Sequence, residues 1–372
     1  VNAGNSIASG GNYNTVVGDE AGTAITTGDN NVAVGFEALK TLATSSQNTA
    51  VGHTALKLNT AANNSAFGYG ALAANTTASN NTALGRSSLE ANTTGGSNVA
   101  VGRDALGANT TASNNTAVGY NSLNANTTGT QNTALGALAL DANTTGSYNT
   151  ALGEKSLSTN ILGAKSTAVG TFSLFNQNPA SAVDMYNVAV GYDAGNAVTT
   201  GVQNTLIGGL AGDAITTGGV NTAVGYNSLG ANTTGIHNTA VGKSSLLSNT
   251  TGSENTAVGQ NAMDANTTGS ANVAVGQSAF GVNTTGGSNV AIGVDALNAN
   301  TTASNNTAVG KSALTANTTG TQNVAVGSSA GDAMTTANNN VTVGHNSMGA
   351  NTTGSSNVAV GAAALAANTT AG

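Results

Sequence analysis

The sequence predicts an all-β protein built as a parallel β-solenoid, and three observations lead to this prediction. A five-residue motif, such as Asn-Thr-Ala-Val-Gly at 115–119, recurs 21 times, and 18 of the 20 intervals between its glycines are 17 residues long. The motif alternates β-branched residues with Ala, which is the period of a β-strand. Most repeats also contain two glycines, which disfavour a helix. A fixed period over a whole chain indicates one unit stacked on itself, so we expect about 21 coils.

Each 17-residue coil is predicted to contain two short strands. The first is the motif, with its β-branched face turned inward, and its glycine ends the strand in a conformation closed to residues with a Cβ. The second strand is [Ala/Ser]-Leu-x-Ala, as at 122–125, and Asn-Thr-Thr-Gly makes the longer turn back. Asn begins the motif in 20 of 21 coils, so an Asn ladder is expected along one edge. The structural ladder residues of one coil are Asn115, Val118, Gly119 and Leu123.

Along the chain, residues 1–13 are expected to form an N-terminal partial coil or an assembly strand, and 14–372 a single solenoid domain. One interval is 16 residues and one is 21, so four extra residues lie within 171–187. This insertion contains the only proline of the chain and two of its five phenylalanines. Phe172, Phe175 and Pro179 are therefore a candidate recognition loop, and the alternative is a local patch that tolerates the insertion.

Two positions of the coil exchange size. In four coils the leucine of the second predicted strand becomes Gly, and in the same coils the Asn three residues later becomes apolar. A large side chain lost at one position is regained at the other, because a cavity in the core costs about 2–5 kcal/mol. Both positions are therefore predicted to face one interior. The pairs are Gly22 and Ile25, Gly195 and Val198, Gly212 and Ile215, and Gly331 and Met334.

Composition argues against several classes of function. Charged residues are 6% of the chain and the net charge is −7, so no basic footprint for a nucleic acid is present. The chain has no cysteine, and its three histidines fall in separate coils, so we expect no metal site. Acidic residues are scattered without a convergent cluster, so we expect no catalytic site, no cofactor and no enzyme activity. No apolar run approaches the ~20 residues of a membrane helix, so membrane insertion is not expected.

The motif Asn-[Thr/Val]-Ala-Val-Gly-x-x-[Ser/Ala] resembles the head repeat of YadA-like trimeric autotransporter adhesins. Similar repeats occur in bacteriophage tail fibres and bacterial surface fibres, and the resemblance covers residues 14–361. It implies a left-handed β-roll, often trimeric, that binds host surfaces. The chain departs from that family in its longer coil and in lacking a coiled-coil stalk and an anchor segment.

Two functions are expected. The first is a structural subunit of an extracellular fibre that assembles end to end, because neither terminal coil has an evident polar cap. Its partner would be another copy, through assembly ends marked by Ile7 and Leu365, with a lateral trimer as a further arrangement. The alternative is the adhesive shaft or head of a phage tail fibre or surface adhesin, which would bind a host-surface glycan or protein. The expected location is accordingly extracellular or at a cell surface, with a virion tail fibre as the alternative.

Overall fold

The computed structural model of the chain describes residues 2–370. Val1, which the prediction places in the N-terminal partial coil, and Ala371 and Gly372, at the end of the predicted solenoid, lie outside this range. The described residues contain 21 three-residue strands and no helix, and nearly all coils are 17 residues long. The prediction of an all-β parallel solenoid is therefore confirmed.

The chain divides into two compact units, Val1–Tyr186 and Asn187–Gly372, with the boundary at the end of the predicted insertion. The first unit contains β1 (Thr15–Val17), β2 (Val32–Val34), β3 (Thr49–Val51), β4 (Ser65–Phe67), β5 (Thr82–Leu84), β6 (Val99–Val101), β7 (Thr116–Val118), β8 (Thr133–Leu135), β9 (Thr150–Leu152) and β10 (Thr167–Val169). The second contains β11 (Val188–Val190), β12 (Thr205–Ile207), β13 (Thr222–Val224), β14 (Thr239–Val241), β15 (Thr256–Val258), β16 (Val273–Val275), β17 (Val290–Ile292), β18 (Thr307–Val309), β19 (Val324–Val326), β20 (Val341–Val343) and β21 (Val358–Val360).

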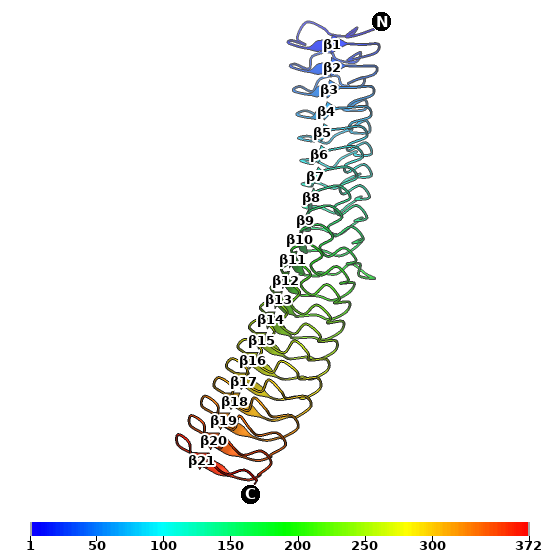
Figure 1. Cartoon of the computed structure of the whole chain (residues 1–372). Coiled ribbons are helices and arrows are strands. Elements are labelled where there is room, and N and C mark those ends of the chain that lie inside the picture. The colour runs from blue at the N-terminus through cyan, green and yellow to red at the C-terminus, as the bar shows by residue number, and fades with distance from the viewer. Residues whose placement is uncertain (1, 371–372) are drawn as a thin grey trace. The chain divides into compact units, whose positions relative to one another are not determined.

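Within each unit, every strand pairs in parallel with the equivalent strand of the next coil (Figure 1). The ladder repeats the same bonds at each step. The backbone N–H of Val99 donates to the carbonyl oxygen of Asn115 at 2.9 Å, and that of Gly119 donates to Val101 at 2.8 Å. Coils in such a ladder are spaced by about 4.8 Å, so each side chain lies directly above its equivalent.

The face of the strand that turns inward is opposite to the prediction. In β7 the central Ala117 is fully buried, whereas Thr116 and Val118 on either side are half-buried and point outward. Every strand from β2 to β21 has a buried central residue, and Leu84 and Leu135 on the outer face are each 49% exposed. The interior is narrow and is already occupied by leucine and asparagine side chains, so most coils leave room only for a methyl group here. The larger β-branched residues lie on the outer face, where the pleated surface suits them.

The second predicted strand of each coil is also wrong, because residues such as 122–125 form turns. In the coil after β3, the N–H of Ala55 donates to Gly52 at 3.3 Å and that of Lys57 to Thr54 at 3.2 Å. The third residues of these two turns, Thr54 and Leu56, have φ of 56° and 51°. Successive turns of type II, with a left-handed residue in third place, therefore replace the strand. Leu56 is fully buried, so its packing offsets the cost of its backbone conformation.

The marker glycine ends each strand for the predicted reason. Gly119 has φ of 137°, and a Cβ there would lie 2.5 Å from the carbonyl oxygen of Gly136 in the next coil. That distance is far shorter than a non-bonded carbon–oxygen contact. The carbonyl oxygen of Gly136 cannot move away without breaking the hydrogen bonds between coils. Glycine is therefore required by both conformation and space.

The exchange of size between two core positions is confirmed. Ile25, Val198, Ile215 and Met334 are all fully buried, and a Cβ on Gly331 would lie 2.8 Å from Sδ of Met334. A third position takes part, which sequence comparison missed. The central strand residue is Ala in every strand except β1, β12 and β20, where it is Val16, Leu206 and Thr342. These three side chains lie 2.7–3.3 Å from the Cβ positions of Gly22, Gly212 and Gly331 respectively. The space left by a missing leucine is thus shared among its neighbours.

Asparagine side chains form two ladders, and both are buried in the core rather than set along an edge. Asn115 at the start of the motif donates its N–H to Oδ1 of Asn98 at 2.9 Å, and its Nδ2 donates to the carbonyl of Gly129 at 2.9 Å. In the second ladder, Nδ2 of Asn126 donates to Oδ1 of Asn109 at 3.0 Å. All four of these asparagines are fully buried. Their amides therefore satisfy backbone groups that the narrow core removes from water.

Candidate functional surfaces

The N-terminal edge of the described chain is a partial coil without a strand, and a role in assembly for residues 1–13 stays a prediction. The N–H of Gly4 donates to Ala21 at 3.0 Å and that of Ala8 to Thr26 at 3.1 Å, so residues 4–8 stack on the turns of the next coil. Ile7 occupies the place that Ile25 takes one coil later, but it is 37% exposed. At the other edge, Leu365 is 47% exposed. The two predicted assembly ends are thus the outermost members of the apolar core columns.

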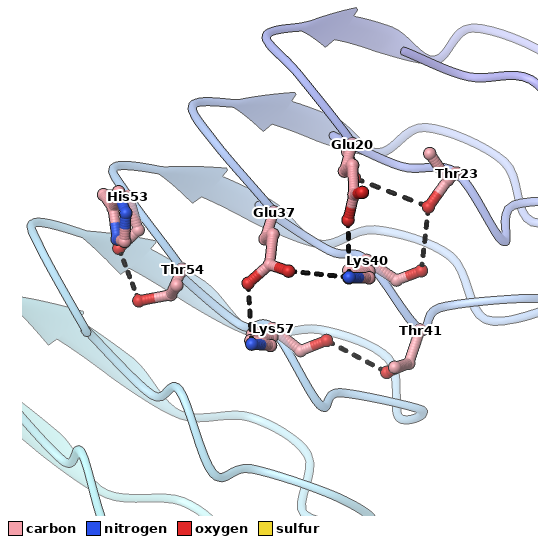
Figure 2. Close-up of polar contacts among 8 residues, drawn as sticks. All are labelled: Glu20, Thr23, Glu37, Lys40, Thr41, His53, Thr54 and Lys57. Atoms are coloured by element: carbon pink, nitrogen blue, oxygen red, sulfur yellow. Dashed lines mark hydrogen bonds and ion pairs between the residues drawn. The ribbon is translucent and has the colours of Figure 1, made fainter. Parts of the chain in front are cut away.

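Four charged side chains cross-link the first three coils of the first unit (Figure 2). Lys40 Nζ lies 2.5 Å from Glu20 Oε2 and 2.6 Å from Glu37 Oε1, and Lys57 Nζ lies 2.6 Å from Glu37 Oε2. The Glu37 side chain is only 12% exposed. Its hydrogen bonds to Lys40 and then Lys57 hold the pKa of Glu37 at about 2, below its ordinary value of 4.5. The carboxylates of Glu20 and Glu37 raise the pKa of Lys40. Each charged group of this cluster is paired with an opposite charge, so the cluster stabilises the packing of the first coils on one another.

A column of aromatic and basic residues follows the marker glycines of the first unit. The rings of Phe36 and His53 are 5.0 Å apart, and those of His53 and Tyr69 are stacked at 4.9 Å and 11°. Further along, the Arg103 guanidinium lies 4.5 Å from the centre of the Tyr120 ring. Because the coils repeat in register, these side chains stack on each other rather than offer their faces to a ligand.

The predicted recognition loop is not an exposed apolar tip. Phe172 and Phe175 are half-buried and pack edge to face at 5.7 Å, with Lys155 Nζ 5.6 Å from the centre of the Phe172 ring. Pro179 is buried. This burial favours the alternative of a local patch that tolerates the insertion, and a recognition role for the three residues stays a prediction. The exposed residues of the insertion are Asn178, 180–184 and Tyr186, and Tyr186 is the one aromatic residue among them.

At the insertion, other polar side chains replace asparagines and keep the buried hydrogen bonds of the ladders. Gln177 takes the place of an Asn and is fully buried, and its Nε2 donates to Oδ1 of Asn160 at 3.3 Å. Ser166 replaces Asn as the first residue of one motif, and its hydroxyl donates to Oε1 of Gln177 at 3.1 Å. The Gln side chain is longer than Asn and therefore reaches the shorter Ser side chain. The two substitutions thus compensate for each other.

A shallow depression lies beside the insertion, within the first unit. Its lining includes Tyr148, Lys165 and Asp184, which come from three consecutive coils. Lys165 Nζ lies 2.7 Å from Asp184 Oδ2 and donates to the Tyr186 hydroxyl at 3.1 Å. Sequence reasoning missed this site. The available signal was that Tyr148, Lys165 and Tyr186 each directly precede the first residue of a motif and so share one column.

Other chemical groups do not converge on a site. Burial raises the pKa of the Asp141, Asp213 and Asp264 carboxyls, but these half-buried groups lie in separate coils. Within residues 2–370, no group of three or more His, Cys, Asp or Glu could hold a metal ion. The Asn-Thr-Thr segments fit the acceptor pattern for N-glycosylation, yet Asn109 and Asn232 are fully buried. A glycosylating enzyme could not reach these amides in the folded chain.

No protein-family model and no curated protein sequence matches the chain. The resemblance to YadA-like head repeats and the left-handed winding that it implies therefore stay predictions. In the part of the chain that the structure describes, no helix is long and apolar enough to cross a lipid bilayer.

Proposed function

We propose that the chain is a structural subunit of an extracellular fibre that assembles end to end. The observation that carries the proposal is the in-register stacking of coils, in which each coil covers the apolar core of the one before it. Leu365 and Ile7 are 47% and 37% exposed, whereas side chains of the same columns within the units, such as Leu314 and Ile25, are fully buried. Stacking of one copy on another would remove these surfaces from water.

Backbone groups at the C-terminal edge support the same proposal. The N–H of Val341 donates to Asn357 at 2.9 Å, and the carbonyl of Val343 accepts from Gly361 at 2.7 Å. Val358 and Val360 present the same donor and acceptor one coil later, at the edge. Unpaired strand edges of this kind template further pairing.

The geometry of the edges suggests how two copies would meet. Residues 4–12 and 361–370 both belong to the turn half of a coil, so the contact would be made turn on turn.

Lateral association would use the outer face of the strands. This face carries Thr or Val and an aliphatic residue in almost every coil and no charged residue, and Ile207 and Ile292 are each 39% exposed. Exposed apolar surface of this extent is typical of an interface, so bundling of copies, up to the trimer that the family resemblance implies, is part of the proposal. An extracellular or cell-surface location, with no enzyme activity, follows from the same role.

The test is the state of assembly of the purified chain, measured by analytical ultracentrifugation and negative-stain electron microscopy as its concentration is raised. End-to-end growth is expected, and the double variant Ile7→Lys with Leu365→Lys should suppress it through charge repulsion and desolvation. Val220→Lys, at an exposed bend outside the strand face and far from both edges, is the matched control and should leave growth unchanged. Particles of monomer mass at every concentration would overturn the proposal.

The second candidate is the adhesive shaft or head of a phage tail fibre or surface adhesin. The depression beside the insertion favours it, because it is a concave surface with an exposed aromatic ring in an otherwise regular stack. Binding of the isolated chain to host-surface glycans or proteins, without any assembly, would favour this role over the fibre subunit.

A further inference from the structure

The depression beside the insertion has a rigid wall. The N–H of Ala164 donates to Val183 at 3.0 Å and that of Met185 donates to Ala164 at 2.9 Å, which makes a short parallel bridge between two coils. Met185 is fully buried and anchors the segment in the core. The exposed residues 182–184 are therefore held against the preceding coils, and the open depression that they border has a volume of about 480 Å³. Ligand pockets span about 300–1,000 Å³, so the space suits one small ring compound or a short oligomer.

The charges that line the depression cancel. Lys165 Nζ and Asp184 Oδ2 are 2.7 Å apart, with side chains 39% and 44% exposed. The ammonium group lowers the pKa of the Asp184 carboxyl, and the carboxylate and the Tyr186 hydroxyl raise the pKa of Lys165, so both groups stay ionised near neutral pH. A neutral pair of this kind offers no net attraction to a cation or an anion. It does offer a strong donor beside a strong acceptor, which is what a hydroxyl group can bond on both sides.

Tyr148 supplies an open aromatic face. Its side chain is 54% exposed, and no ring pair or cation–π contact involves it within residues 2–370. Tyr69, Tyr120 and Tyr186 differ in that His53, Arg103 and Lys165 already lie over their rings. A free tyrosine ring packs against aliphatic C–H groups and brings a hydroxyl to the rim of the site.

We propose that the depression formed by Tyr148, Lys165 and Asp184 binds a neutral saccharide. Its ring C–H face would stack on Tyr148, and its hydroxyls would bond Lys165 and Asp184. Thr145 and Ser147, which line the depression beside Tyr148 in the sequence, add hydroxyl groups. A sugar is the class of compound that combines an uncharged apolar face with adjacent hydroxyls, and this site offers partners for both. The site lies within one unit, so its binding does not depend on assembly of the chain.

Saturation-transfer-difference NMR of the full 372-residue chain tests this with the methyl glycosides of glucose, galactose, mannose and N-acetylglucosamine. At least one should bind with millimolar affinity, as a single shallow sugar site allows, and Tyr148→Ala should weaken binding roughly tenfold or more. Tyr226→Ala is the matched control, because Tyr226 is 55% exposed in a regular coil of the second unit. It should leave binding unchanged.

A second variant tests the role of charge cancellation. Asp184→Asn leaves Lys165 without its carboxylate, so the methyl glycoside of sialic acid, an anion, should now bind better relative to the neutral glycosides. Both substitutions lie at exposed side chains, and circular dichroism should show an unchanged β spectrum. Absence of transfer from all four neutral glycosides to the wild-type chain would overturn the proposal. Equal binding by the wild type, Tyr148→Ala and Asp184→Asn would also overturn it.

Discussion

Leu206 occupies the space that a side chain at position 212 would need. A Cβ placed on Gly212 would lie 2.7 Å from Cδ2 of Leu206 and 2.8 Å from Cδ1 of Ile215. In the next coil the equivalent residues are Ala223, Leu229 and Asn232, and all three are fully buried. The large apolar side chain there is at position 229, whereas the coil of Gly212 has its large side chains at the other two positions. The core therefore specifies a total volume per coil and leaves its distribution among three positions open.

This relationship predicts a rescue. Gly212→Leu should lower the free energy of unfolding by about 1–3 kcal/mol through overpacking, although Leu is accepted at this φ in the neighbouring coil. Adding Leu206→Ala and Ile215→Asn restores the common composition of the coil and should recover most of the loss. Urea denaturation of the single and triple variants gives the comparison. Equal instability of both variants would mean that the three positions do not share one space.

The marker glycine should be irreplaceable. Gly119→Ala should cost more than about 3 kcal/mol, because it adds backbone strain to a clash with the carbonyl of Gly136. Gly209→Ala is the control, since a Cβ there meets nothing closer than a Tyr226 ring carbon at 3.7 Å. It should change stability by less than about 0.5 kcal/mol in thermal and urea unfolding. Similar losses for the two variants would contradict the role given to the marker position.

The buried Asn ladder should reject a charge. Asn126→Asp places a carboxylate between Asn109 and Asn143 in the core, and the loss at neutral pH should be about 3–5 kcal/mol. Burial raises the pKa of such a carboxyl in the folded state, so part of the stability should return as pH falls through that raised value. Asn114→Asp, at an exposed position just before the motif of this coil, should show neither effect. Unfolding curves at several pH values measure both variants.

The charged cluster at the first coils should weaken in acid. The pKa of Glu37 is about 2 when folded and near 4.5 otherwise, so its stabilisation is fully present above pH 4.5 and is lost as pH falls toward 2. Glu37→Gln removes the charge, so the difference in stability between this variant and the wild type should shrink over the same interval. Hydrogen exchange of the amides of residues 20–57 reports the loosening locally. A difference that is independent of pH would rule out this electrostatic cause.

One consequence of a broken ladder is visible without mutation. Met334 replaces the Asn that would follow Asn317 in the second ladder, and within residues 2–370 the buried Oδ1 of Asn317 has no hydrogen-bond partner. The apolar contact of Met334 beside Gly331 is therefore gained at the expense of a hydrogen bond. The ladder tolerates such an interruption where a neighbouring position has lost its leucine.

The sequence by itself determined the coil. Comparison of the repeats is enough to find the period, the parallel register, the need for glycine at 119 and the shared interior of positions 22 and 25. This works because every repeat must satisfy the same local constraints. These features are local in the coil or repeat unchanged from one coil to the next, and that is why no knowledge of the fold was required to find them.

The tertiary structure alone decided which face of the strand is inside. Ala117 and Val118 are both apolar, and alternation gives two faces without saying which one the core can hold. That choice depends on the width left by Leu123 and the asparagines once successive turns close the coil. The wall around Tyr148, Lys165 and Asp184 depends likewise on how the insertion folds back across two coils, which no repeat in the chain records. Closure of the chain in space, rather than its pattern, set both outcomes.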